Sequence, residues 1–261
     1  MGILERFSLE GKVALVTGGA GKYGRQVVCA VAGAGARVFV ASRSIAPLET
    51  LAAELNAAGG QVEALSFDQG DEASVRALRD TILGRAGRCD VLVNNAVLRP
   101  MLGGWDSPAA QFAESMRVNA TGLFIISRAF GNAMAERGAG AMVNIGSIQG
   151  RVGPDPAIYT GTDMHGWVPD YFFHKGGMEN FTRFLASYYG RFGVRCNCLA
   201  PGGFQTPEHP EAFVRQYSER TCLGRMANDT DLMGAVVFMA SDAAKYITGA
   251  VLPVDGGYTA K

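Results

Sequence analysis

The sequence predicts an α/β fold in which seven parallel strands form one doubly wound sheet with helices on both faces. Short apolar runs alternate with longer segments that carry apolar residues at three- and four-residue spacing. A glycine-rich turn follows the first of these runs. A chain of 261 residues with 48% hydrophobic side chains is long enough for one large core, so we expect a single domain over residues 1–261.

The predicted elements follow one another along nearly the whole chain. The expected strands are 13–18, 37–42, 62–68, 91–96, 141–147, 194–202 and 251–257. The helical patterns cover 25–34, 48–58, 72–86, 111–136, 175–192 and 230–241. Because helical segments separate the strands, parallel pairing is expected throughout the sheet.

Two segments depart from this alternation. Residues 148–170 hold three prolines and four glycines without a period, and residues 203–222 are polar and marked by prolines. Both follow strands, and ligands of open α/β sheets bind beyond the carboxyl ends of the strands. We expect 148–170 to be an active-site loop and 203–222 a substrate lid; the alternative is that both are surface or subunit-contact loops.

Charge and composition point to a small-molecule ligand. The 24 Lys and Arg balance the 24 Asp and Glu, and the sequence has no basic cluster, so neither nucleic acid nor an anionic membrane is expected as a partner. No signal-peptide pattern and no long apolar run occurs, so a cytoplasmic protein is expected. The five cysteines lack metal-site spacing; we expect buried thiols and no metal.

The turn TGGAGKYG opens a predicted helix directly after the first strand. Its glycines Gly18, Gly21 and Gly24 let the backbone approach a pyrophosphate, and free N–H groups at the helix start favour the anion. Lys22 and Tyr23 belong to the same turn. This context predicts a Rossmann-type dinucleotide site.

The end of the second strand bears on the choice of cofactor. An acidic residue there would hold the ribose hydroxyls of NAD, but this chain has Ser42 and Arg43. Ser42 leaves room, and Arg43 and Lys22 offer positive charge to a 2′-phosphate, which favours NADP(H). If both cations are solvated surface residues, NAD(H) is the alternative.

Further motifs occur in a fixed order after the glycine turn. They are Asn94-Asn95-Ala96, Asn119, Ser147, Tyr171-x-x-x-Lys175, Pro201-Gly202-x-x-x-Thr206 and the terminal YITGAVLPVDGG. With these motifs the chain resembles the short-chain dehydrogenase/reductase family over essentially its whole length. The resemblance implies an NAD(P)-dependent oxidoreductase that assembles as a homotetramer.

The chemistry explains why a tyrosine and a lysine belong together. Hydride transfer at a carbonyl carbon requires a proton at the oxygen, and a free phenol, with a pKa of about 10, is a weak base at neutral pH. Lys175, one helical turn beyond Tyr171, can stabilise the phenolate. The resemblance implies that Lys175 also binds the nicotinamide ribose, that Ser147 holds the substrate oxygen, and that Asn119 anchors a water on the proton path.

The resemblance assigns the other motif residues to the cofactor. It places Asn95 at the ribose and the central strand, Asp68 at the adenine amino group, and Thr206 at the carboxamide or phosphates. Pro201 and Gly202 belong to the same cofactor site.

The chain also departs from the family pattern. The family's tyrosine position falls on Tyr159, but Asp163 stands where its lysine belongs, so Tyr171 is the predicted proton donor. An insertion of about eleven residues before the catalytic helix accounts for the shift and costs little closure entropy. Val97 replaces the glycine that usually follows the Asn-Asn-Ala motif, which predicts a differently shaped turn.

The predicted loop gives the first indication of the substrate. Tyr159 and Trp167 offer a hydroxyl and flat faces, and Arg99 offers a cation, which together suit a sugar or sugar acid. The expected reaction interconverts a secondary alcohol with a ketone or lactone. The glycine spacing leaves a sugar-nucleotide epimerase or dehydratase as an alternative, and a non-catalytic nucleotide-binding regulator is another. Ser147, Tyr171 and Lys175 favour the oxidoreductase, as does the VDGG ending.

Overall fold

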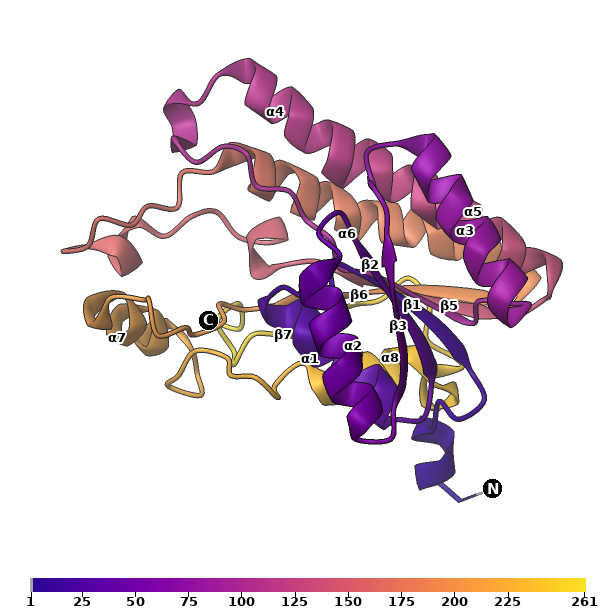
Figure 1. Cartoon of the computed structure of the whole chain (residues 1–261). Helices are drawn as coiled ribbons and strands as arrows, with labels where there is room; N and C mark the ends of the chain where they lie inside the picture. Colours follow the sequence, from indigo (N-terminus) through magenta and orange to yellow (C-terminus); the bar gives the residue numbers. More distant parts are fainter. Residues whose placement is uncertain (1) are drawn as a thin grey trace.

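A computed structural model describes residues 2–261, which form one seven-stranded parallel sheet in the order β3-β2-β1-β4-β5-β6-β7 (Figure 1). The strands are β1 (Val13–Thr17), β2 (Arg37–Ser42), β3 (Gln61–Ser66), β4 (Val91–Asn94), β5 (Gly140–Ile145), β6 (Val194–Pro201) and β7 (Val251–Val254). The predicted fold class is therefore confirmed, with strands that end slightly earlier than expected at the glycine- and asparagine-rich turns.

Within residues 2–261, eight α-helices connect or follow the strands. They are α1 (Lys22–Gly33), α2 (Ala46–Ala57), α3 (Glu72–Ala86), α4 (Ala109–Met116), α5 (Gly122–Glu136), α6 (Pro169–Tyr189), α7 (Glu211–Arg220) and α8 (Met233–Ala240). The predicted helix 111–136 is divided by a π-helical turn, Arg117–Thr121. Helix α6 begins at Pro169 instead of residue 175, and α7 lies in the segment that was expected to be an irregular lid.

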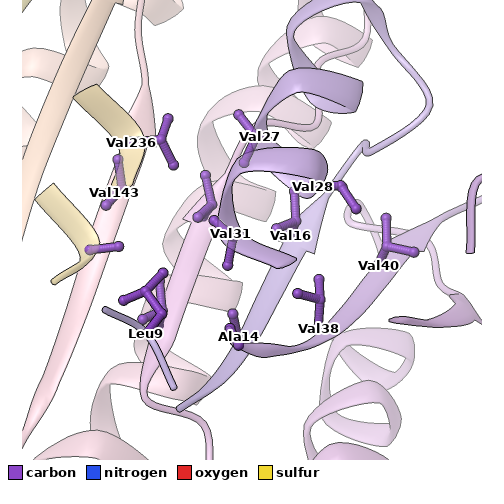
Figure 2. Close-up of a cluster of buried hydrophobic side chains, with 14 of the residues drawn as sticks. Leu9, Ala14, Val16, Val27, Val28, Val31, Val38, Val40, Val143 and Val236 are labelled. Atoms are coloured by element: carbon purple, nitrogen blue, oxygen red, sulfur yellow. The ribbon is translucent and has the colours of Figure 1, made fainter. Parts of the chain in front are cut away.

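The strands bury alternate side chains in two separate apolar layers. On one face, Val16 and Val40 pack with Val28 of α1 in a cluster that also includes residues of α2 and α8 (Figure 2). On the other face, Leu15 and Phe39 pack with α3, α5 and α6. Burial on both faces explains why these strands read as continuous apolar runs.

The carboxyl ends of the strands face the long connecting segments. Between β5 and α6 the chain forms two 3₁₀ turns, Ile148–Gly150 and Pro156–Tyr159. This connection and α7 project together from one side of the sheet, away from the N-terminus (Figure 1). Among the helices of residues 2–261, none is both long and apolar enough to cross a bilayer.

All five cysteines are free thiols. Cys89, Cys196 and Cys198 are buried as predicted, whereas Cys222 is exposed beside the backbone of Gly257, which corrects the expectation for that residue. Within residues 2–261, no group of three His, Cys, Asp or Glu side chains comes together in a metal-binding arrangement.

Candidate active site

Two adjoining cavities open at the carboxyl edge of the sheet. The first, of about 450 Å³, runs across the ends of β1, β2, β4, β5 and β6. It brings together most of the predicted cofactor residues, namely Gly18, Gly21, Lys22, Tyr23, Gly24, Ser42, Arg43, Asp68, Asn95, Tyr171, Lys175, Pro201 and Gly202. Strand order reverses between β1 and β4, and a ligand crevice is expected at such a switch point.

The second cavity, of about 280 Å³, lies under the connection between β5 and α6. Its walls include Ile158 and Tyr159 from this connection, and Phe213 and Tyr217 from α7. The two cavities share six lining residues: Lys22, Tyr23, Arg99, Ser147, Tyr171 and Gly202. A side chain at this junction can therefore contact ligands in both cavities.

The glycine turn is packed so closely that it excludes side chains. Gly18 has a φ of +69°, and a Cβ there would lie 2.7 Å from the Cα of Ala96. A Cβ on Gly24 would lie 2.2 Å from the carbonyl oxygen of Gly18. Gly21 is the N-cap of α1, so the free N–H groups of the helix start lie beside the cavity.

Asn95 fastens the glycine turn to β4. Its side-chain amide donates to the carbonyl oxygens of Thr17 (3.0 Å) and Gly18 (2.8 Å). In return, the Thr17 hydroxyl accepts from the backbone N–H groups of Asn95 and Ala96. The predicted support of the central strand is thus present, while a contact between Asn95 and the cofactor ribose stays a prediction.

Tyr23 links the start of α1 to the end of β6. Its hydroxyl donates to the carbonyl oxygen of Gly202 at 2.8 Å, and its ring contacts Phe204 edge-on. Burial raises the pKa of Tyr23 far above the usual range, so this phenol remains protonated and acts as a donor. Tyr23 thereby fixes one wall of both cavities.

The far end of the first cavity holds the residues that were predicted to contact the 2′-phosphate and the adenine. Arg43 is exposed at the end of β2, next to Ser42, whose hydroxyl donates to the carbonyl oxygen of Ser44. Asp68 lines the same end, and its carboxylate accepts from the N–H of Gly70 at 2.8 Å. No acidic side chain follows β2 directly, as the sequence indicated.

Tyr171 and Lys175 lie one turn apart on α6. Lys175 is buried, its Nζ donates to the carbonyl oxygen of Ile145 at 2.5 Å, and Nζ lies 5.6 Å from the centre of the Tyr171 ring. Burial lowers the pKa of Lys175, and the neighbouring Tyr171 opposes this shift. Ser147 follows β5, is 7% exposed, and lines both cavities with Tyr171.

Asn119 is buried within the π-helical turn that separates α4 from α5. Its amide donates to the carbonyl oxygen of Leu98 and the hydroxyl of Ser115, and its oxygen accepts from the N–H of Leu98. Asn119 lines neither cavity, so its predicted action through a water stays a prediction. What the structure shows is that Asn119 positions the turn that leads to Arg99.

Three residues predicted for the substrate or cofactor lie outside the junction. Tyr159 stacks on Phe213 in the second cavity and has no hydrogen bond to a lysine among residues 2–261. Trp167 is half exposed, and the backbone N–H of Thr206 donates to His209; neither residue lines a cavity. Arg151, in the connection between β5 and α6, pairs with Glu179 at 3.5 Å and also lines neither cavity.

Sequence reasoning missed two parts of the site. The first is the helical form of the predicted lid: Phe213 and Tyr217 of α7 join an apolar cluster, and the Tyr217 hydroxyl accepts from the N–H of Gly203 at 2.6 Å. The four-residue spacing of these two rings was the available sign of a helix. The second is His174, which is buried next to the Tyr171 ring without a hydrogen-bond partner for either nitrogen.

Comparison with known proteins agrees with this geometry. A family model described as "Enoyl-(Acyl carrier protein) reductase" matches residues 22–259. Together with the Tyr171–Lys175 turn and the glycine turn over a seven-stranded sheet, this match shows that the chain belongs to the short-chain dehydrogenase/reductase family. The chain is therefore an oxidoreductase by family.

Its relatives include several sugar and polyol dehydrogenases. Galactitol 2-dehydrogenase (L-tagatose-forming) of Cereibacter sphaeroides is 36% identical over 97% of each chain. D-threitol dehydrogenase of Mycolicibacterium smegmatis is 33% identical over 98% of this chain and 95% of its own. A crystal structure of a gluconate 5-dehydrogenase from Burkholderia cenocepacia, in complex with NADP and tartrate, superposes with a TM-score of 0.88 at 31% identity over all of both chains.

Proposed function

We propose that the chain is an NADP(H)-dependent dehydrogenase that interconverts a secondary alcohol and a ketone or lactone on a sugar, polyol or sugar acid. The observation that carries this proposal is the meeting of Ser147 and Tyr171 at the junction of two cavities, with Lys175 behind the tyrosine. Names of relatives such as galactitol, threitol and gluconate dehydrogenases support the substrate class.

The first cavity fits a dinucleotide. Gly18, Gly21 and Gly24 line it without side chains, so a pyrophosphate can approach the backbone closely. Arg43 and Lys22 supply positive charge for a 2′-phosphate, and Asp68 lies at the adenine end. When bound there, the nicotinamide supplies the hydride acceptor or donor.

The chain's own residues transfer the proton to and from the substrate oxygen. Ser147 orients the substrate oxygen, and the Tyr171 phenolate takes its proton as the alcohol is oxidised, or the phenol returns it on reduction. Lys175 stands beside the ring and stabilises the phenolate. Its bond to Ile145 holds the ammonium in place, so the charge is positioned before the substrate arrives.

The test is a turnover assay in which purified protein meets NADP⁺ or NAD⁺ with a panel of polyols, sugar acids and simple secondary alcohols. We expect growth of reduced-cofactor absorbance with polyhydroxylated substrates, and faster turnover with NADP⁺. Isomerised product without net cofactor change would indicate an epimerase, and tight cofactor binding with no turnover of any compound would indicate a nucleotide-binding regulator.

We also propose a cytoplasmic homotetramer. Phe184 and Tyr188 of α6 stack on one another at 6.1 Å while remaining at least half exposed, and Phe124 of α5 is 43% exposed. An exposed aromatic face of this kind is typical of an oligomer interface. Light scattering should give the mass of four chains, and Phe184→Glu should shift it to smaller species.

The five free cysteines fit a reducing compartment, which cell fractionation tests.

A further inference from the structure

Arg99 is a cation at the junction of the two cavities with no ion-pair or hydrogen-bond partner among residues 2–261. It follows β4, and its guanidinium carbon lies 4.5 Å from the centre of the Tyr171 ring. The side chain is exposed to the cavities instead of being folded against an acidic neighbour. A guanidinium in this setting has its fork of donors free for a ligand.

The other charges of the second cavity do not neutralise Arg99. Asp155, an acidic residue of the lining, already pairs with Arg220 at 2.8 Å. Lys22 adds a second cation to the lining, and its charge helps to lower the pKa of Glu208, after the hydrogen bond from Thr206. Burial lowers the pKa of His209, so this imidazole adds no full charge at neutral pH, and the fixed charge of the lining is positive overall.

The field of Arg99 reaches the groups around it. Its charge contributes, after burial, to the lowered pKa values of Lys175 and His174. At Tyr159 it opposes the increase in pKa that burial causes. Because no carboxylate pairs with Arg99 among residues 2–261, an anion bound to its guanidinium would be stabilised in this partly enclosed space.

The apolar part of the lining suits the carbon skeleton of a ligand. Ile158, Tyr159, Phe213, Tyr217 and Met226 form one apolar and aromatic surface. A ligand that lies against this wall presents one end to Ser147 and Tyr171 and another to Arg99. Because Arg99 stands directly over the Tyr171 ring, an anionic group on Arg99 is only a few bonds from the reacting carbon.

We propose that Arg99 binds a substrate carboxylate, so that the preferred substrates are hydroxy acids and their keto forms and not neutral polyols. This inference rests on the proposed function and names its substrate class. In the oxidation the carbinol carbon loses its hydride to the nicotinamide and the hydroxyl proton goes to Tyr171, while the carboxylate stays unchanged and bonded to Arg99.

The experiment compares acids with their neutral counterparts: gluconate with glucitol, galactonate with galactitol, and threonate with threitol. With NADP⁺, wild-type protein should give a higher kcat/KM for the acid of at least one pair. Arg99→Met should lower that acid's kcat/KM by about 10- to 150-fold, the usual loss for hydrogen bonds to a charged group, and should reduce the acid-to-neutral ratio accordingly. The kcat/KM of Arg99→Lys for that acid should lie between the values of the wild type and Arg99→Met, because lysine keeps the charge but not the forked set of N–H donors.

Arg151→Met is the matched control, since Arg151 is an arginine of the connection between β5 and α6 that lines neither cavity, and the acid-to-neutral ratio of this variant should match the wild type. If Arg99→Met lowers kcat/KM equally for acids and neutral substrates and also shifts the pH profile, Arg99 acts on the titration of Tyr171 and the proposal is overturned. Faster turnover of every polyol than of its acid also overturns it while leaving the proposed function intact. No turnover of any compound rejects both.

Discussion

The ring of Tyr171 has two cations near it that differ in their surroundings. Nζ of Lys175 lies 5.6 Å from the ring centre, and the guanidinium carbon of Arg99 lies 4.5 Å from it. Lys175 is buried and bonded to Ile145, whereas Arg99 has no hydrogen-bond or ion-pair partner among residues 2–261. The buried cation is thus fixed for the proton step, and the exposed one is accessible to a ligand.

Replacing the phenol should separate chemistry from binding. Tyr171→Phe removes the proton carrier at the junction, so kcat should fall by about 10²- to 10⁴-fold, as is usual for a lost general acid or base. NADP(H) binding, measured by titration calorimetry, should change little. Tyr159→Phe is the paired control because Tyr159 lines only the second cavity. If it abolishes turnover while Tyr171→Phe does not, the catalytic assignment is wrong.

Cofactor choice should depend on the cation after β2. Arg43→Ala removes a charge at the end of the first cavity where a 2′-phosphate would lie. The kcat/KM for NADP⁺ should fall by about 10- to 150-fold. The same variant assayed with NAD⁺, which lacks that phosphate, should stay within about threefold of the wild type, because it loses no charge-assisted bond. Equal losses with both cofactors would contradict a role in phosphate recognition.

The glycine turn should not tolerate a methyl group at Gly24. A Cβ there meets the Gly18 carbonyl oxygen at 2.2 Å, so Gly24→Ala should lower the free energy of unfolding by about 1–3 kcal/mol and weaken cofactor binding. Gly33→Ala, at the other end of the same helix, has open space around its Cβ and should raise stability by up to about 1 kcal/mol. Urea denaturation with and without NADP⁺ measures both effects.

His174 should make the protein less stable in mild acid. Burial, aided by the charges of Lys175 and Arg99, lowers the pKa of His174 to about 3 from an ordinary value of 6.5. Between these values the unfolded chain binds a proton that the folded chain does not, so stability falls as the pH drops below 6.5. For such a group the loss between pH 7 and pH 5 is about 2 kcal/mol.

The measurement is urea denaturation at both pH values for the wild type and His174→Gln. The variant lacks the titrating group, so its stability difference between pH 7 and pH 5 should be smaller by that amount, whatever its stability at pH 7. An unchanged difference would mean that the folded protein accepts the proton on His174 without cost.

The sheet and the glycine turn were predictable because local sequence determines them. Leu15 and Phe39 stand in runs that only a strand buried on both faces explains, and Gly18 must adopt a positive φ. The Tyr171–Lys175 turn was also predictable, since four-residue spacing on a helix sets the separation of the two side chains.

Other parts depend on contacts between distant segments. Helix α7 is short, and the burial of its apolar side depends on distant residues such as Ile158 and Tyr159, more than fifty positions before Phe213. Trp167 was expected at the substrate, but it lies outside the cavities. The prediction failed because local sequence does not determine the path of the connection after β5. The burial of His174 could not be predicted from its local sequence, because it depends on the helices that pack against α6.

The wall of the second cavity has an apolar cluster of its own, separate from the two layers that hold the sheet. Ile148, Ile158, Phe213, Tyr217 and Met226 pack with one another, and none belongs to either sheet layer. Changes in this wall therefore leave the packing within both sheet layers unaltered, so the second cavity can be reshaped while the sheet keeps its core. Relatives that share about a third of their residues with this chain bear the names of dehydrogenases for different substrates.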